Sequence, residues 1–201
     1  MDLLPLQERI AFYNDELAFK EVYYLFYNKL FHFAYAFIKN KERAEEITED
    51  VFINLWRNRS HLTEIKNLKV YLYTATKNSS LNYIAKRAHE ITTAPYDDIA
   101  IDIAEYDATP EQIMISSEML KKLNKAIDEL PPRCKIIFKL IREDGLRYKE
   151  VAEILSLSVN TIDAQMAIAV KRIAMSINLE FKNLTRLKEF IAKKNKNALV
   201  D

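Results

Sequence analysis

The residues best suited to chemistry lie between positions 66 and 89, where cations, aromatics and amides share one segment. Five Lys or Arg side chains occur there without a single Asp or Glu. Cations track phosphates, aromatic rings stack on unpaired bases and amides read base edges, so this mixture favours single-stranded nucleic acid. A lysine-rich solvated face is the simpler interpretation, but such faces usually pair lysines with acids at i, i+4. The predicted contacts are Lys66, Asn67, Lys69, Tyr73, Thr76, Lys77, Asn78, Lys86 and Arg87.

Spacing predicts that this segment is a helix with two different faces. One row recurs every three or four positions and is expected to be the binding face: Lys66, Lys69, Tyr73, Lys77 and Ser80. A second row suits packing: Leu68, Leu72, Ala75 and Ser79. Residues at these spacings lie on one side of a helix.

A second candidate binding element is a helix-turn-helix over residues 148–173. The segment "YKEVAEIL" is followed by the turn "SLS", where Ser158 can cap a second helix. Its expected buried stripe is Val159, Ile162, Met166, Ala169 or Val170, and Ile173, with Val151, Ala152 and Leu155 inward on the first helix. Such units also occur as plain packing units. The residues left for a DNA major groove and its phosphates are Ser158, Asn160, Thr161, Asp163, Ala164, Gln165, Lys171 and Arg172.

Two N-terminal helices precede these elements. The first has a broad apolar face: Phe19, Val22, Tyr23, Phe26, Leu30, Phe33, Ala34 and Phe37. The second carries four acids within six positions before it ends in Leu55-Trp56-Arg57: Glu45, Glu46, Glu49 and Asp50. Two interpretations of these four acids remain open: an ordinary solvent-exposed helix face, or a binding face for a cation-rich partner.

Other counts exclude several classes of protein. The single glycine, Gly145, argues against phosphate-cradling loops and dinucleotide turns. The lone Cys134 permits no internal disulfide or thiolate metal cage and is expected to be a buried small residue, and the three histidines lack partners at metal or triad spacing. We therefore expect no catalytic residue, no metal and no cofactor. Because neither a secretory signal nor a long apolar run is present, a cytoplasmic protein without membrane insertion is expected.

The charge distribution divides the chain. The net charge of +1 hides blocks of opposite sign: +5 for residues 66–89, −8 for residues 88–120 and +7 for residues 121–201, with −3 for residues 1–65 completing the sum. One glycine and five prolines leave little turn chemistry for a β fold. The expected fold is all-α, with two small helical domains joined by a flexible acidic linker. The expected limits are 1–92, a linker over 93–109, 110–180 with a helix starting at Thr109-Pro110, and a C-terminal tail over 181–201.

With both halves laid out, the chain resembles the bacterial extracytoplasmic-function (ECF) RNA polymerase sigma factors. "FKEVYYLFYNKLFHFAYAFIKNKERAEEITEDVFINLWRNR" and "LKVYLYTATKNSSLNYIAKR" resemble region 2 of that family, and "ELPPRCKIIFKLIREDGLRYKEVAEILSLSVNTIDAQMAIAVKRI" resembles region 4. The run "TIDAQMAIAVKRI" is most similar to bacteroidete-type members. The chain departs at Ser156, where many relatives have Gly, and at Asp163, where many carry Lys.

The resemblance implies a role for each candidate group. The acidic helix, with Leu55 and Trp56, would bind the β′ clamp of core RNA polymerase, and the β flap is a further expected contact. The loop Arg59–Asn67 and the following helix would capture the minus-10 element of promoter DNA, and the second helix-turn-helix segment would read the minus-35 element. An anti-sigma factor is implied as a partner.

The main alternative is a stand-alone helix-turn-helix regulator that binds DNA without polymerase. A hydrolase built on the acidic cluster is a more distant one, because no nucleophile–base pair is present.

Overall fold

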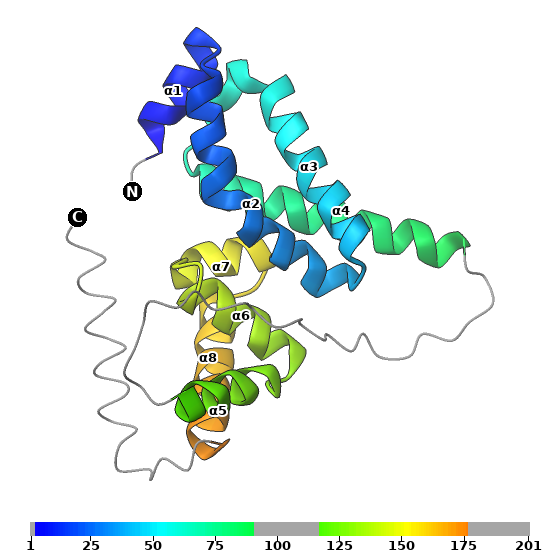
Figure 1. Ribbon diagram of the computed structural model, residues 1–201, viewed down its shortest axis with the longest axis vertical. Helices are drawn as coiled ribbons and strands as arrows, with labels where there is room; N and C mark the ends of the chain where they lie inside the picture. The colour runs from blue at the N-terminus through cyan, green and yellow to red at the C-terminus, as the bar shows by residue number, and fades with distance from the viewer. Residues whose placement is uncertain (1–2, 91–116, 177–201) are drawn as a thin grey trace. The chain divides into compact units, whose positions relative to one another are not determined.

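The computed structural model describes residues 3–90 and 117–176, and every secondary-structure element in these stretches is helical (Figure 1). Residues 3–90 form α1 (Leu4–Tyr13), α2 (Glu16–Ile38), α3 (Lys41–Arg57), the 3-10 helix η1 (Arg59–Glu64) and α4 (Leu68–Glu90). Residues 117–176 form α5 (Ser117–Asp128), α6 (Pro132–Arg142), α7 (Tyr148–Leu155) and α8 (Val159–Ser176). The predicted all-α class is confirmed. The acidic linker, the tail, the expected domain limits and the helix start at Pro110 lie outside the described residues.

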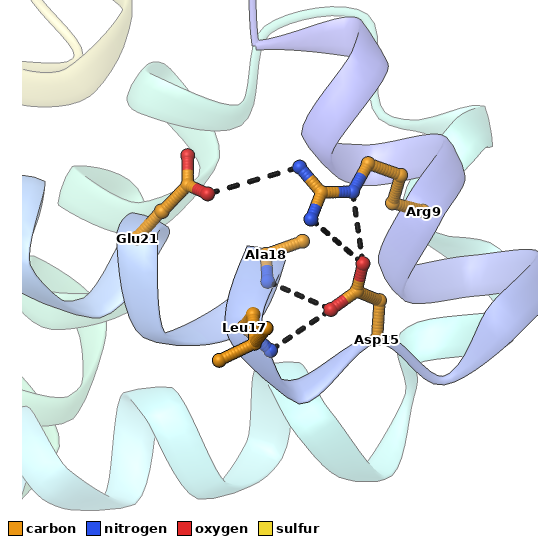
Figure 2. Close-up of polar contacts among 5 residues, drawn as sticks. All are labelled: Arg9, Asp15, Leu17, Ala18 and Glu21. Carbon is orange, nitrogen blue, oxygen red and sulfur yellow. Dashed lines mark hydrogen bonds and ion pairs between the residues drawn. The ribbon is translucent and has the colours of Figure 1, made fainter.

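The turn between α1 and α2 is fixed by Asp15. One of its oxygens accepts hydrogen bonds from the backbone N–H groups of Leu17 (2.9 Å) and Ala18 (3.1 Å), and the other accepts from Arg9 Nε at 2.9 Å (Figure 2). The Ala18 amide, followed by Arg9, holds the pKa of the Asp15 carboxyl below its usual range. A charged cap of this kind satisfies free amides at the start of α2 and sets where that helix begins.

The core of residues 3–90 is built around α2, which packs on both α3 and α4. The predicted periodicity is confirmed where Val22, Phe26 and Leu30 are buried. Aromatic rings then join the helices edge to face: Phe19 lies 5.0 Å from Trp56 of α3, and Phe33 of the same α2 face lies 5.2 Å from Tyr73 of α4. Such pairs add specific geometry to the burial of apolar area.

The helices α1 and η1 were not predicted from the sequence. Pro5 in the first turn of α1 is a start signal, but only Gln7 and Ile10 of this helix are buried. So sparse an apolar pattern does not distinguish a helix from a loop.

Helices α5, α6 and α8 share a small core. Ala126 of α5, Cys134 of α6 and Ala169 and Ile173 of α8 belong to one buried cluster, and Leu130 between the first two helices joins them. Cys134 is 3% exposed, so the prediction of a buried small residue is confirmed. Helix α6 begins at Pro132, as the Pro-Pro pair predicted.

A residue in the left-handed backbone conformation follows α6, and another follows α7. Gly145 has a φ of 69°, and the next amide, of Leu146, donates to the carbonyl of Leu140 at 2.9 Å, which closes α6 as predicted. Ser156 ends α7 with a φ of 57°, a conformation that glycine adopts more easily. The departure seen in the sequence at Ser156 is therefore a strained position in the turn.

The helix-turn-helix of α7 and α8 follows the predicted pattern except at two residues. Ser158 Oγ accepts from the backbone N–H of Thr161 at 3.0 Å, so Ser158 caps the helix. Val159 is 40% exposed rather than buried, because the buried stripe of α8 begins only at Ile162. On α7, Val151 and Ala152 are buried as predicted, but Leu155 is only half-buried and the neighbouring Ile154 is fully buried in its place.

Candidate polymerase and nucleic-acid interfaces

The acidic face of α3 is exposed to solvent. Asn40 caps this helix by accepting from the backbone N–H of Arg43 at 2.8 Å, and Glu46, Glu49 and Asp50 are exposed while Glu45 is half-buried. Arg43 forms an ion pair with Glu46 across one turn. The cluster therefore keeps a net negative charge on an accessible helix face, which favours a cationic partner.

Two tyrosines of α2 lie within the field of these acids. Burial, followed by the neighbouring Tyr23 and the carboxylates of Glu49 and Glu45, raises the pKa of the Tyr27 hydroxyl. Burial and then Glu49 raise the pKa of Tyr23 in the same way. Both phenols stay neutral at physiological pH and add apolar surface beside the acids.

The structure corrects one member of this candidate site. Leu55 is 1% exposed and belongs to the core, because its position faces inward with Val51 and Phe52. The apolar residue that accompanies the acids is Ile53, at 47% exposure. Ile53 follows Glu49 and Glu46 at spacings of four and seven, so the i, i+4, i+7 pattern could have identified it.

Trp56 is half-buried and participates in two contacts. Its ring packs on Phe19, and the guanidinium of Arg59 lies 4.7 Å from the ring centroid. Arg59 also donates to the carbonyl of Trp56 at 3.0 Å. The residue therefore joins the end of α3 to η1.

Some candidate residues of the cationic segment, residues 66–89, are exposed and others are buried. Lys66, Asn67, Asn78, Lys86 and Arg87 are exposed, and Lys69 and Lys77 are half-buried. Tyr73, Thr76 and Ser80 are fully buried, so the prediction that they belong to the binding face is wrong. The physical reason is that α4 contacts both α2 and α3, so its buried stripe is wider than one row.

Local hydrogen bonds make the burial of Thr76 and Ser80 possible. Thr76 Oγ1 donates to the carbonyl of Leu72 at 2.9 Å, and Ser80 Oγ donates to the carbonyl of Thr76 at 2.8 Å. Hydroxyls bonded back to i−4 carbonyls need no solvent. The exposed aromatic at the start of α4 is Tyr71, at 38% exposure, which the sequence had not singled out.

A cavity of about 310 Å³ lies where α3, η1 and α4 meet. Leu55, Leu62, Ile65 and Tyr71 supply its apolar walls, whereas its polar lining comes from Asn58, His61 and Glu64. His61 Nδ1 lies 3.0 Å from Glu64 Oε1. The volume falls at the lower end of ligand-binding cavities, and an apolar wall with a few polar groups suits a planar, polar-edged ligand.

The first turns of α8 carry a single charged residue, Asp163, and its cations lie further along the helix. Asn160, Asp163, Ala164, Lys171 and Arg172 are exposed. The remaining expected contacts are held locally: Thr161 Oγ1 lies 2.8 Å from Ser158 Oγ, and Gln165 Oε1 accepts from the thiol of Cys134 at 2.8 Å. Val159 and Ile168 are also exposed, at 40% each, so the exposed side chains of α8 combine aliphatic groups with one anion in the first turns and two cations further along.

Neither a metal centre nor a membrane span is found within residues 3–90 and 117–176. No cluster of three or more His, Cys, Asp and Glu side chains there could hold a metal ion. No helix within these stretches has the length and apolar character to cross a membrane.

Two family models match the chain in the order that the helices follow. The model described as "Sigma-70 region 2" matches residues 23–90, and the model described as "Sigma-70, region 4" matches residues 120–173. Together they cover more than half of the 201 residues. The chain belongs to the sigma-70 family. This sigma factor directs transcription initiation by RNA polymerase, and its family is not an enzyme family.

Its relatives refine the assignment. The sigma factor is 22% identical to the ECF sigma factor SigW of Bacillus subtilis, over 76% of this chain and 85% of that protein. It is 25% identical to the ECF sigma-E factor of Haemophilus influenzae, over 80% of this chain and 87% of that protein. It is also 25% identical to SigE of Mycolicibacterium smegmatis, but the match spans only 53% of that relative. These matches support an ECF sigma factor.

Solved structures agree on the fold. The sigma factor RpoE of Bartonella quintana, bound to the anti-sigma factor NepR, aligns with a TM-score of 0.56 and 22% identity over 81% of this chain and 98% of RpoE. CnrH, bound to the cytosolic domain of CnrY, aligns with a TM-score of 0.54 and 15% identity over 89% of this chain and 99% of CnrH.

Proposed function

We propose that this sigma factor divides promoter recognition among three helices. Helix α3 binds core polymerase, α4 with η1 captures the minus-10 element, and α8 reads the minus-35 element. The observation that supports this division best is the separation of charge: exposed acids lie on α3, exposed cations lie on α4, and α8 carries both.

The polymerase contact is assigned to the acidic face of α3 and to Ile53. Exposed Glu46, Glu49 and Asp50 complement a basic surface such as the β′ clamp, and exposed Ile53 supplies apolar contact beside them. Trp56 contributes through its half-exposed ring. A further contact between the C-terminal helices and the β flap follows from the family resemblance.

The minus-10 contact is assigned to the cations of α4 and the cavity beside η1. Lys66, Lys86 and Arg87 are exposed and suit phosphates, while Tyr71 offers an exposed ring for stacking. The cavity is large enough for one unstacked base, whose polar edge would meet Glu64 or Asn58. Asn78 remains a candidate for reading a further base.

The minus-35 contact is assigned to the first turns of α8. Exposed Asp163 can accept from the amino group of a cytosine, and exposed Ala164 can contact a thymine methyl group. Lys171 and Arg172, two turns later, suit phosphates. Only weak binding by this helix alone is expected, and the polymerase and the other contacts supply the rest through high effective concentration.

Three finer assignments rest on the resemblance. The run "TIDAQMAIAVKRI" supports a bacteroidete-type member. Binding by an anti-sigma factor is supported by structural neighbours that carry such a partner. A cytoplasmic location is proposed because core polymerase is expected there.

Run-off transcription tests the proposal. The purified chain is added to core polymerase with a fragmented genomic library, and start sites are mapped. We expect transcripts from a small set of promoters, and their loss when Glu49 and Asp50 are both changed to Lys. Sequence-specific DNA binding without polymerase, together with no gain of transcription, would instead favour a stand-alone regulator.

A further inference from the structure

Helix α1 is fastened to η1 at both of its ends, although α1 lies before the residues that match region 2. At one end, Gln7 Nε2 donates to the carbonyl of Leu62 at 2.6 Å and to the carbonyl of Ile65 at 2.9 Å. At the other end, Arg59 Nε donates to Asn14 Oδ1 at 2.5 Å. The 3-10 helix is therefore held between a buried amide and a second amide just after α1.

Gln7 is an unusual residue for a packing position. Its side chain is 3% exposed and lies one turn before the fully buried Ile10. A buried amide gives up its hydrogen bonds to water and regains them only if it finds partners of good geometry. An apolar residue would bury the same area without that requirement, so stability alone does not explain an amide at this position.

The two carbonyls that Gln7 holds belong to residues that line the cavity. Leu62 and Ile65 form part of its apolar wall, and His61 and Glu64, which supply polar groups, lie on the same turn. At the end of η1 the Ile65 amide donates to the Leu62 carbonyl at 3.2 Å, so this carbonyl is shared with Gln7. Short 3-10 turns have weak hydrogen-bond geometry, so their shape depends on outside contacts of this kind.

We propose that α1 is a positioning element for minus-10 recognition, in which Gln7 and Asn14 fix the shape of η1 and thereby the base preference of the cavity beside it. The inference rests on the proposed role of that cavity. Gln7 is a positioning residue rather than a contact, because it acts through the backbone of Leu62 and Ile65. Asn14 acts in the same way through Arg59, which also lies over the ring of Trp56.

Two variants separate this role from general stability. Gln7→Met keeps the length and apolar volume of the side chain but removes both donors. Asn14→Gly keeps the left-handed backbone, whose φ is 51°, and removes only the acceptor for Arg59. Glu8→Gln is the matched control, because Glu8 is exposed on the same helix.

The measurement is selection of forked DNA with a randomised single-stranded minus-10 element by the holoenzyme, followed by sequencing. Core-polymerase affinity and thermal unfolding are measured in parallel. For Gln7→Met we expect the preference at one or two base positions to fall by about five- to tenfold, as the loss of two neutral hydrogen bonds allows. Core affinity should stay within about twofold, and Asn14→Gly should reduce the preference at the same positions to a smaller extent.

The outcomes are distinguishable. Unchanged base preference in both variants, with or without a loss of stability, would overturn the positioning role and leave Gln7 as a satisfied core residue. An even loss across all positions would also overturn it, because a phosphate or folding effect is not position-specific. If the wild-type holoenzyme selects no sequence at all, the proposed function of the cavity fails first, and this inference fails with it.

Discussion

The buried ion pair between Asp128 and Lys135 offers a quantitative test of how the α5–α6–α8 core is held. Lys135 is 1% exposed, and its ammonium lies 2.8 Å from the Asp128 carboxylate and 3.3 Å from the Asp128 carbonyl. Changing Asp128 to Ala removes the carboxylate and leaves a buried charge with one carbonyl. For a fully buried pair the loss is about 3–5 kcal/mol.

The structure indicates a smaller value here. The Asp128 side chain is 42% exposed, so water already screens part of its attraction, and the backbone carbonyl remains as a partner. We therefore expect a loss of about 2 kcal/mol, equal to about thirtyfold in the opening equilibrium. Glu129→Ala is the matched control, because Glu129 forms only a surface pair with Lys125 at 3.9 Å and should cost less than about 1 kcal/mol.

The chain carries a separate reporter in each half. Cys134 is the only cysteine and is 3% exposed, and burial raises the pKa of its thiol, so labelling requires opening of this core. Trp56 is the only tryptophan and lies in α3. If the opened core closes again faster than the thiol reacts, the labelling rate is proportional to the equilibrium constant for opening of the core. Asp128→Ala should therefore label about thirtyfold faster, while the urea midpoint from Trp56 fluorescence stays unchanged.

A double variant completes the test. Asp128→Ala combined with Lys135→Met removes both charges and should recover most of the loss, because a packed apolar side chain replaces the uncompensated ammonium. The reasoning is refuted if Asp128→Ala is as mild as Glu129→Ala. It is also refuted if the double variant opens as readily as the single one.

Further predictions concern the backbone, the pH and the salt. Lys39 ends α2 with a φ of 53°, so Lys39→Gly should raise the free energy of unfolding, measured in urea by tryptophan fluorescence, by about 0.5–1 kcal/mol. Gly145→Ala, at a φ of 69°, should speed thiol labelling although nothing lies within 4 Å of the added methyl group. Because the pKa of Asp15 is lowered in the fold, its stabilisation is present above its ordinary value near 3.8 and is lost as the pH falls through the lowered pKa. The stability difference between wild type and Asp15→Ala, measured by tryptophan fluorescence, should thus shrink at acid pH, and a difference that grew there would contradict the assignment. Lys69→Ala should weaken binding of single-stranded minus-10 DNA and lower the slope of log affinity against log salt by about 0.7, and an unchanged slope would remove Lys69 from the phosphate contacts.

Periodicity and end signals in the sequence were sufficient for most of the helices. The recurrence of Val22, Phe26 and Leu30 predicted the buried face of α2, and Ser158 and Gly145 predicted two helix ends that the structure has. These signals are local: each depends on residues within one or two turns, and the backbone responds to them in the same way in most folds.

These local signals gave wrong predictions of exposure where a helix packs against more than one neighbouring helix. Tyr73 lies between a row of lysines and a row of leucines in the sequence, and its ring is buried because α4 packs against other helices, among them α2 with Phe33. Leu55 was expected at a binding surface and is in the core, whereas Ile53 is exposed beside the acids. An error of one or two residues in the inward direction of a helix exchanges a contact residue for a core residue.

The sequence by itself determined an all-α chain, the helix-turn-helix and the placement of acids and cations on separate helices, because these depend on residue type and local spacing. Only the tertiary structure decided which cationic-segment residues stay exposed, that a cavity forms beside η1 and that Gln7 and Asn14 hold that turn. The hydrogen bonds of Gln7 and Asn14 join residues more than 40 positions apart, such as Gln7 and Leu62. Their formation depends on how whole helices pack, and no local pattern encodes it.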